Sequence, residues 1–252
     1  WQITELGKNQ DLNKLTRAPK QAIALNLVRH QSCSHEQMLE EEITAATLKA
    51  VVDKGWIEEI SLAPKPSYWQ RNVEVTQEKP QLNEEQAIAI ATVNASPEFG
   101  CYLLDGVTGS GKTEVYLQLL EPILKAGRQA LVLVPEIGLT PQTINRFKRR
   151  FNVPVEVIHS GLNDSERLNA WLSARDKIAG IVIGTRSALF TPFADLGIII
   201  VDEEHDASYK QQDSLRYHAR DVAIMRAHKA QLPVVLGSAT PAFETLHNAQ
   251  IG

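Results

Sequence analysis

Residues 106–113 read Gly-Val-Thr-Gly-Ser-Gly-Lys-Thr, which is the complete pattern G-x-x-x-x-G-K-[ST]. An apolar run, residues 102–105, precedes the pattern, and a helix-like run that begins at Glu114 follows it. A strand, a glycine-rich loop and a helix are the context that a phosphate-binding P-loop requires. The glycines permit a tight turn whose N–H groups point at phosphate oxygens, and the helix presents its positive end to the same anion. This segment therefore predicts a nucleotide site at the end of a strand.

The P-loop pattern gives each position an expected role. Lys112 is expected to reach the β- and γ-phosphates, and Thr113 to hold Mg²⁺. The residues expected to surround ATP or ADP are Gly106, Val107, Thr108, Gly109, Ser110, Gly111, Lys112 and Thr113.

A second apolar run, residues 197–201, ends in Asp202-Glu203-Glu204-His205. Such a run is typical of a strand that is buried on both faces of a parallel sheet. Acidic residues at its carboxyl end lie where ligands bind in open α/β sheets. We expect Asp202 to complete the Mg²⁺ shell with Thr113, and Glu203 to orient and deprotonate the attacking water. Lys112, Asp202 and Glu203 are thus the expected catalytic residues.

Strand-like and helix-like runs alternate beyond residue 81, which favours a mainly parallel sheet with helices on both faces. The expected fold class is an α/β P-loop NTPase of the RecA-like type in residues 81–252. Helices are expected at residues 141–150 and 219–229. Strands are expected at residues 101–105, 130–134, 155–159, 179–184, 197–201 and 233–237.

The first 62 residues have a different pattern, three short helices followed by a strand, which is the outline of a small α+β winged-helix domain. We expect helices from Pro19, after the capping-box-like residues 34–37, and over residues 43–52, and a strand over residues 55–60. The third helix carries only Lys49 and Lys54 as basic residues, so duplex DNA binding and a role as an interaction or spacer domain both stay open. Pro64-Lys65-Pro66 and the polar run through Lys79-Pro80 predict a linker over residues 63–80.

Composition limits the other function classes. The formal net charge of −4 gives no overall basic footprint, so any nucleic-acid contact must come from local patches. The two cysteines form no C-x-x-C pair, which favours a reduced, cytoplasmic protein without a zinc site in this segment. No apolar run approaches bilayer length, and without an initiating Met the sequence is expected to be a piece of a longer protein.

The loops at the expected strand ends resemble motifs Ia, Ib and III of superfamily 2 helicases, at residues 135–142, 184–190 and 237–240. Together with residues 106–116, 159–167 and 202–212, they resemble more specifically the PriA family of bacterial primosomal replication-restart helicases (primosomal protein N′). The resemblance implies an ATP-dependent 3′→5′ DNA helicase that recognises stalled or abandoned replication forks and restarts replication by primosome assembly. It also implies forked and single-stranded DNA, other primosomal proteins and single-stranded-DNA-binding protein as partners, a monomer, and a place in the bacterial nucleoid.

The resemblance assigns further residues by their place in the motifs. Gln86 would read the adenine, and Thr185 and Arg186 would grip the tracked strand. His205, Ser238 and Thr240 would couple the nucleotide and DNA sites. An aromatic-rich loop would stack on bases and pair with phosphates through Tyr209, Lys210, Arg216, Tyr217, His218 and Arg220. For Tyr217 and Arg220, packing of the following helix is the alternative.

The family also carries an N-terminal DNA-end-binding domain, a zinc-binding insertion, a second helicase lobe and a C-terminal domain, which this sequence lacks. The second lobe supplies an arginine finger, a group worth about 10³ to 10⁵ in rate in well-studied NTPases. We therefore expect this chain to bind nucleotide weakly, to hydrolyse it poorly and not to unwind DNA. The competing interpretations are another P-loop enzyme, such as a kinase or transporter ATPase, and a non-catalytic module that binds DNA or a partner.

Overall fold

The computed structural model describes residues 1–12, 15–16, 18–30, 32–33, 38, 41–60, 69–77, 79–96, 98–213 and 215–251. The chain forms two compact units, Trp1–Ala63 and Pro64–Gly252. The capping-box-like residues 34–37 and the first part of the expected linker lie outside the described residues.

The smaller unit combines helices with a two-stranded antiparallel sheet. Helix α2 begins at Pro19, as the sequence predicts, and α4 is capped by Thr44, whose Oγ1 accepts a hydrogen bond from Thr47 N. Gly55 follows α4 with a φ of 67°, a left-handed conformation that glycine adopts without strain. Its elements are β1 (Gln2–Ile3), α1 (Glu5–Lys8), α2 (Pro19–His30), α4 (Ala45–Asp53) and β2 (Ile57–Glu58).

Strand β1, which the sequence did not predict, pairs with β2 and closes one side of this unit. Its Ile3 and the Ile57 side chain of β2 are buried together with Leu25 of α2 and Val51 of α4. A two-residue strand gives no periodic signal, so only its partner could be found from sequence.

The larger unit is built on a six-stranded sheet in which every pair of neighbouring strands is parallel. The predicted α/β fold class is confirmed, and a strand is present at each of the six predicted places. In spatial order the strands are β3 (Gly100–Asp105), β10 (Pro233–Ser238), β7 (Leu196–Val201), β4 (Gln129–Leu133), β6 (Ile181–Gly184) and β5 (Val155–Ile158). Because they are parallel, all six carboxyl ends meet at one edge.

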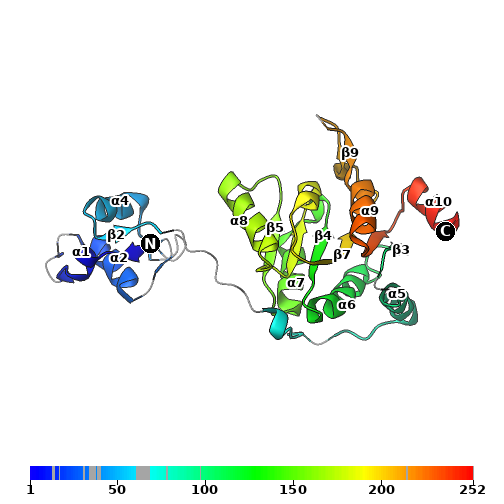
Figure 1. The fold of residues 1–252 in the computed structure, drawn as a ribbon, viewed down its shortest axis with the longest axis horizontal. Helices are drawn as coiled ribbons and strands as arrows, with labels where there is room; N and C mark the ends of the chain where they lie inside the picture. The colour runs from blue at the N-terminus through cyan, green and yellow to red at the C-terminus, as the bar shows by residue number, and fades with distance from the viewer. Residues whose placement is uncertain are drawn as a thin grey trace. The chain divides into compact units, whose positions relative to one another are not determined.

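Helices cover both faces of this sheet (Figure 1). One core lies under α5 (Glu84–Asn94), α6 (Lys112–Lys125) and α7 (Pro141–Arg150), and the other under α8 (Asp164–Arg175) and α9 (Ala219–Ala230). Strand β4 serves both cores, since Ala130 and Val132 belong to the first, and Leu131 and Leu133 to the second.

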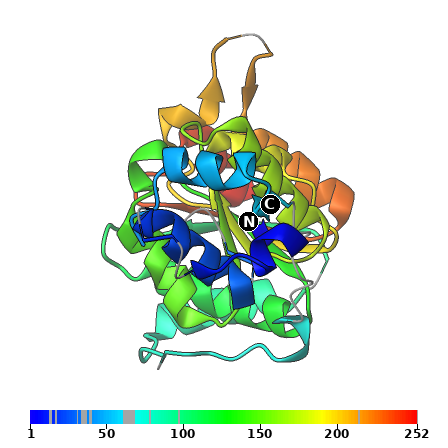
Figure 2. The same ribbon diagram turned by 90° about the vertical axis from the view of Figure 1, so that its left-hand side faces the viewer.

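Shorter elements lie at the carboxyl ends of the strands and carry several of the predicted site residues. They are η3 (Glu136–Gly138), η4 (Arg186–Phe190), η5 (Ala207–Tyr209), the antiparallel pair β8 (Lys210–Gln211) and β9 (Tyr217–His218), and α10 (Phe243–Ile251). Figure 2 shows β8 and β9 standing off the rest of the larger unit. None of the helices in the described part of the chain is long and apolar enough to cross a membrane.

The described part of the expected linker packs on the larger unit. Trp69 of η2 (Trp69–Arg71) is buried in the first core, and its Nε1 donates to Lys177 O at 3.0 Å. Further along, Thr76 N donates to Arg150 O at 2.9 Å, and Val75 forms a bridge with Phe151. These contacts hold the segment along the end of α7 on its way to α5. The indole of Trp69 contributes a large buried area, but the polar residues that surround it in the chain gave no indication of this packing.

Candidate functional site

The predicted P-loop connects β3 to α6. Gly109 and Gly111 have φ values of 83° and 88°, in the left-handed region that favours glycine. Gly111 precedes the first residue of α6 and has no side chain, so no side chain at the N-cap position occupies the first N–H groups of the helix. A helix end of this kind is suited to bind an anion.

Lys112 is the first residue of α6, and its side chain is 9% exposed. Its Nζ donates to Gly106 O at 2.6 Å and lies 3.8 Å from Glu203 Oε1. The ammonium group therefore lies between the glycine-rich loop and the acidic end of β7.

Asp202 follows β7, and its Oδ1 accepts a hydrogen bond from Tyr116 OH at 2.8 Å. Burial raises the pKa of the Asp202 carboxyl, while the Tyr116 hydroxyl opposes that rise. Burial and the nearby Asp202 charge raise the pKa of Tyr116 well above its usual value. Glu203 has a φ of 47°, an uncommon conformation for a non-glycine residue and one found at functional sites.

The P-loop and the acidic end of β7 border one cavity of 640 Å³. Its lining includes the predicted Thr108, Gly109, Gly111, Lys112, Thr113, Asp202 and Glu203. Gly106, Val107 and Ser110 belong to the same loop but are not part of the described lining. The rest of the wall is formed by Gln77, Pro80, Glu114, Leu117, Arg146 and Arg150, none of which the sequence singled out as a site residue.

Gln86 lies in the first turn of α5, beside the P-loop. Its Nε2 donates to Ser110 O at 2.8 Å, and its Oε1 accepts from Asn83 N at 3.0 Å in a capping box. A Cβ on Gly111 would lie 2.4 Å from Gln86 Nε2, so a side chain at this position would displace the Gln86 amide from the loop. The described cavity lining does not include Gln86, whose visible contacts support the loop.

The three predicted coupling residues lie together between the ends of β7 and β10. His205 Nδ1 and Ser238 Oγ are 2.6 Å apart, and His205 Nε2 and Thr240 Oγ1 are 3.3 Å apart. His205 Nδ1 also lies 3.7 Å from Glu203 Oε2. A continuous set of polar contacts thus leads from the cavity acid to the loop after β10.

Two of the predicted DNA contacts lie in the interior. Tyr209 is fully buried, and its hydroxyl donates to Asp202 O at 2.7 Å. Thr185 is 5% exposed, and its N–H donates to Ile158 O at 3.0 Å at the start of η4. In this arrangement both residues support the strand ends from within.

The other predicted contacts lie on or next to the β8–β9 pair. Lys210 and Arg216 are exposed, whereas Tyr217 and His218 are half-buried. Burial raises the pKa of Tyr217, which packs edge-on against Phe190 at 5.3 Å between ring centroids. Burial also lowers the pKa of His218.

Arg186 reaches this pair from η4. Its NH1 donates to Ser208 O at 3.1 Å and to Lys210 O at 2.7 Å. The guanidinium therefore fastens η4 to the start of β8, and a side-chain hydrogen bond between Arg186 and Tyr217 links it to β9 as well.

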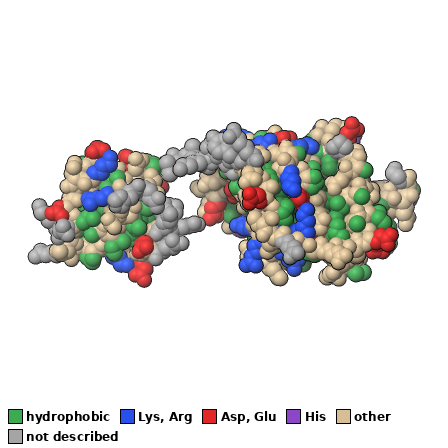
Figure 3. Space-filling view, turned by 90° about the horizontal axis from the view of Figure 1, so that it is seen from below, with side chains coloured by type: hydrophobic (Ala, Val, Ile, Leu, Met, Phe, Trp, Pro, Cys, Tyr) green, Lys and Arg blue, Asp and Glu red, His purple; other side chains and the backbone are tan. Residues whose placement is uncertain are grey.

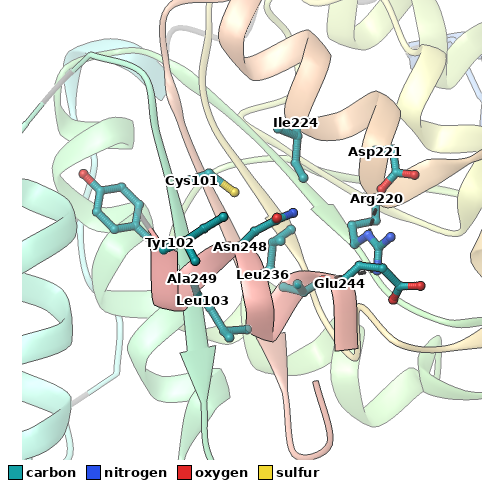
Figure 4. A pocket seen from close by; sticks show the side chains of 12 residues that line it. Cys101, Tyr102, Leu103, Arg220, Asp221, Ile224, Leu236, Glu244, Asn248 and Ala249 are labelled. Carbon is teal, nitrogen blue, oxygen red and sulfur yellow. Dashed lines mark hydrogen bonds and ion pairs between the residues drawn. The ribbon is translucent and has the colours of Figure 1, made fainter. Parts of the chain in front are cut away.

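Arg220 lies in a different environment, at the start of α9. Its NH1 donates to Glu204 Oε2 and to Thr245 Oγ1, both at 3.1 Å, and Glu204 is fully buried. Arg220 also lines a second cavity, of 580 Å³, between β3, α9 and α10 (Figure 4). Figure 4 shows it on the same side of this cavity as Glu244 and Asp221, away from Cys101. These contacts agree with the packing alternative for Arg220.

Comparison with known proteins places these features in a family. A model of the DEAD/DEAH box helicases matches residues 83–249, well over half of the chain. The chain belongs to the DEAD/DEAH box helicase family. A second model, of the primosomal protein N′-like winged helix, matches residues 1–59.

Relatives of this helicase chain include replication restart proteins PriA. The chain is 50% identical to that of Haemophilus influenzae, over 100% of this chain and 35% of the relative. It is 46% identical to that of Bacillus subtilis, over 84% of this chain and 27% of the relative. The resemblance to the PriA family is thus confirmed, and the chain spans about a third of the length of these relatives.

Among solved structures, RecG bound to a three-way DNA junction is similar to 67% of this helicase chain, with a TM-score of 0.50 and 25% sequence identity. The match covers 22% of that protein. It agrees with the helicase-like arrangement of the parallel sheet in the larger unit.

Helicases of this family use a nucleotide and Mg²⁺, and the cavity has the donors for both. The N-terminus of α6 and Lys112 are suited to phosphates, while the Thr113 hydroxyl and the Asp202 carboxylate are the hard oxygen ligands that Mg²⁺ prefers. Across the residues that the structure describes, no group of three or more His, Cys, Asp or Glu could hold a metal ion by itself. The cavity therefore fits a metal that arrives with phosphate ligands.

The residues that sequence reasoning missed come from outside the motifs. Gln77 and Pro80 lie in the segment that the sequence predicts to be a linker, and Arg146 and Arg150 lie in α7, to which the sequence motifs assign no site residue. The i, i+4 spacing of the two arginines puts both on one face of α7, but no sequence signal shows that this face borders the P-loop cavity.

Proposed function

We propose that the larger unit is the ATP-binding first lobe of a superfamily 2 DNA helicase with 3′→5′ polarity. The whole protein would act at stalled or abandoned replication forks and restart replication by primosome assembly. The observation that carries this proposal is the meeting of Lys112, Asp202 and Glu203 at one cavity, with Lys112 Nζ 3.8 Å from Glu203 Oε1.

Each of these groups has a role in phosphoryl transfer to water. Lys112 would pair with the β- and γ-phosphates of ATP, and Thr113 and Asp202 would hold Mg²⁺, which neutralises phosphate charge when bound. Glu203 would orient the attacking water and accept its proton. The strained backbone at Glu203 and the contact to His205 would fix the direction of its carboxylate.

DNA would bind at the carboxyl edge of the sheet. Arg186, Lys210, Arg216, Tyr217 and His218 offer cations and π-faces there, which suit phosphates and unpaired bases. His205, Ser238 and Thr240 would transmit occupancy of this edge to Glu203. The name of the RecG structure includes a DNA junction, which supports DNA as the ligand of this fold.

The resemblance to PriA proteins supports the remaining assignments. Forked and single-stranded DNA, other primosomal proteins and single-stranded-DNA-binding protein would be the partners of the whole protein. We expect a monomer in the bacterial cytoplasm, at the nucleoid.

The smaller unit is better suited to bind a protein partner than to read duplex DNA. Of the two basic residues in or next to α4, Lys54 donates to Gln21 Oε1 at 2.7 Å and lies 4.5 Å from the centre of the Trp56 ring. Both lysines are exposed, but these contacts hold Lys54 against the smaller unit, which leaves little basic surface on this helix. An interaction role is therefore the second function that we propose for this chain.

Binding of labelled ATP to the chain, with and without Mg²⁺, tests the nucleotide site. Lys112→Ala should weaken Mg²⁺-dependent binding about tenfold or more, because it removes a charge-assisted contact to phosphate. Lys125→Ala is the matched control, since Lys125 lies on the same helix, is exposed and pairs with Glu121. Equal binding by both variants would contradict the proposal.

The same preparation tests the expected limits of this chain. We expect little hydrolysis of ATP and no unwinding of a forked duplex, because the residues that would complete the site lie in a second lobe. Vigorous DNA-stimulated turnover by the chain alone would contradict that expectation.

A further inference from the structure

The wall of the 640 Å³ cavity has a part that neither the P-loop nor the acidic strand end supplies. It comes from Gln77 and Pro80 before α5, Leu117 of α6, and Arg146 and Arg150 of α7. Leu117 lies five residues beyond Lys112, about 7 Å further along the helix axis. This part of the cavity therefore extends past the phosphate end, along α6 toward Leu117.

The two arginines of this wall differ in their partners. Arg150 is 4% exposed and forms an ion pair with Glu114, whose Oε1 accepts from Gln118 Nε2 at 2.9 Å. Arg150 Nε is buried and has no hydrogen-bond partner among the described residues. Arg146 is exposed, and within the described residues nothing pairs with its guanidinium.

Contacts of the neighbouring backbone hold this wall in place. Thr76 N donates to Arg150 O, and Glu74 N donates to Asn152 Oδ1 at 2.8 Å. Gln77 and Pro80 follow directly and border the same cavity as Arg146. Figure 3, which views the larger unit from the side where α6 and α7 lie in Figure 1, shows Lys and Arg side chains grouped among apolar ones on this face.

A planar cation between apolar surfaces suits a flat heteroaromatic ring. A guanidinium stacks on aromatic faces, and Pro80 and Leu117 add apolar surface to the same cavity. The Gln77 amide can donate to or accept from the edge of such a ring. By contrast, Gln86 has its amide engaged with Ser110 O and Asn83 N.

Resting on the proposed ATP site, we propose that Arg146 is the residue that selects the base of the nucleotide, by stacking its guanidinium on a purine ring. Gln77, Pro80 and Leu117 form the remainder of this base subsite. A two-ring purine offers more surface to the guanidinium than a one-ring pyrimidine does, so ATP is favoured over CTP. Arg150, neutralised by Glu114, supports the wall.

Competition against labelled ATP by unlabelled ATP, CTP and inorganic tripolyphosphate tests this proposal on the whole chain. Arg146→Ala should raise the dissociation constant of ATP about fivefold, as expected for loss of a cation–π contact made by an exposed arginine. It should narrow the difference between ATP and CTP and leave the affinity for tripolyphosphate unchanged. Arg149→Ala, an exposed arginine of α7 outside the described cavity lining, is the matched control and should change none of these values.

Arg146→Lys separates stacking from charge. It keeps the cation but loses the planar group, so the weakened ATP binding should persist. Rescue by lysine, or an equal loss of ATP and tripolyphosphate, would assign Arg146 to the phosphates and overturn the proposal. Unchanged ATP binding by Arg146→Ala would overturn it as well.

Lys112→Ala in the same assay distinguishes failure of the base subsite from failure of the nucleotide site. Loss of both ATP and tripolyphosphate in that variant, with no effect of Arg146→Ala, would reject only the role of Arg146. No effect of Lys112→Ala on either ligand, or no ATP binding by the wild-type chain, would reject the nucleotide site and the base subsite together.

Discussion

The nucleotide cavity and the β8–β9 region differ in whether the residues predicted from the sequence motifs lie together in the structure. At the cavity, seven predicted residues from two strand ends line the same space. In and around the β8–β9 pair, the predicted DNA contacts separate, with Lys210 and Arg216 exposed, Tyr209 fully buried and Arg220 held by Glu204.

The difference arises because the P-loop functions mainly through its backbone, whereas the β8–β9 region would function through its side chains. The P-loop acts largely through its backbone and a helix end, and the glycine pattern fixes both. A loop that binds through side chains depends on which of them turn outward, and neighbours distant in sequence decide that.

Tyr209→Ala should lower the free energy of unfolding of the larger unit by about 3–5 kcal/mol, because it empties a fully buried aromatic site. Tyr217→Ala should cost about 1 kcal/mol, since Tyr217 is only half-buried, but should weaken single-stranded DNA binding. Urea unfolding and DNA titration measure the two effects. If Tyr209→Ala were as stable as the wild type but bound single-stranded DNA more weakly, Tyr209 would act by contacting DNA, and the structural role assigned to it would be wrong.

Arg220→Ala should lower the free energy of unfolding by about 3 kcal/mol, because the fully buried Glu204 would lose its charged partner. Arg216→Ala removes an exposed arginine four residues away and should change stability by less than about 0.5 kcal/mol. That variant should instead weaken DNA binding and reduce its salt dependence. A loss of DNA binding in Arg220→Ala, with a loss of stability in Arg216→Ala, would place the Arg220 guanidinium at the DNA and contradict its assignment to packing.

Asp202→Asn should stabilise the folded chain at neutral pH. Burial raises the pKa of Asp202 in the folded chain, so the folded state binds this proton more tightly than the unfolded state does. The free energy of unfolding therefore falls as the pH rises from the unfolded pKa through the folded one, and stays lower above it. Asparagine removes this loss and keeps an oxygen acceptor for Tyr116 OH.

Thermal unfolding of Asp202→Asn and wild type over a pH series measures that difference, which should vanish in acid. Asp176→Asn is a control of opposite sign, because the hydrogen bond from Arg175 lowers the pKa of the exposed Asp176 carboxyl. In the wild-type chain, the Asp176 carboxylate contributes stability above its pKa in the unfolded state. This contribution is lost as the pH falls through its pKa in the folded state. Parallel pH curves for the two variants would contradict the assigned role of burial at Asp202.

Much of the fold could be predicted from the sequence, because long elements leave periodic or continuous apolar patterns. The runs at residues 130–134 and 197–201 each predict a buried strand, and Pro141 begins α7 where a proline fits the first turn. Strand β1 and the packing of Trp69 could not be predicted in this way. Both depend on partners far along the chain, Ile57 for β1 and Lys177 for Trp69.

The P-loop, the acids that serve it and the alternation that makes a parallel sheet all follow from the amino-acid sequence alone. These features are local, since they follow from glycine conformations, from helix ends and from the carboxyl ends of buried strands. Four other features emerge from three-dimensional packing: Arg146 borders the nucleotide cavity, Gln86 supports the loop, and Tyr209 and Arg220 turn inward. Those outcomes depend on packing between distant segments, because each side chain takes the direction that buries its apolar atoms and satisfies its polar ones.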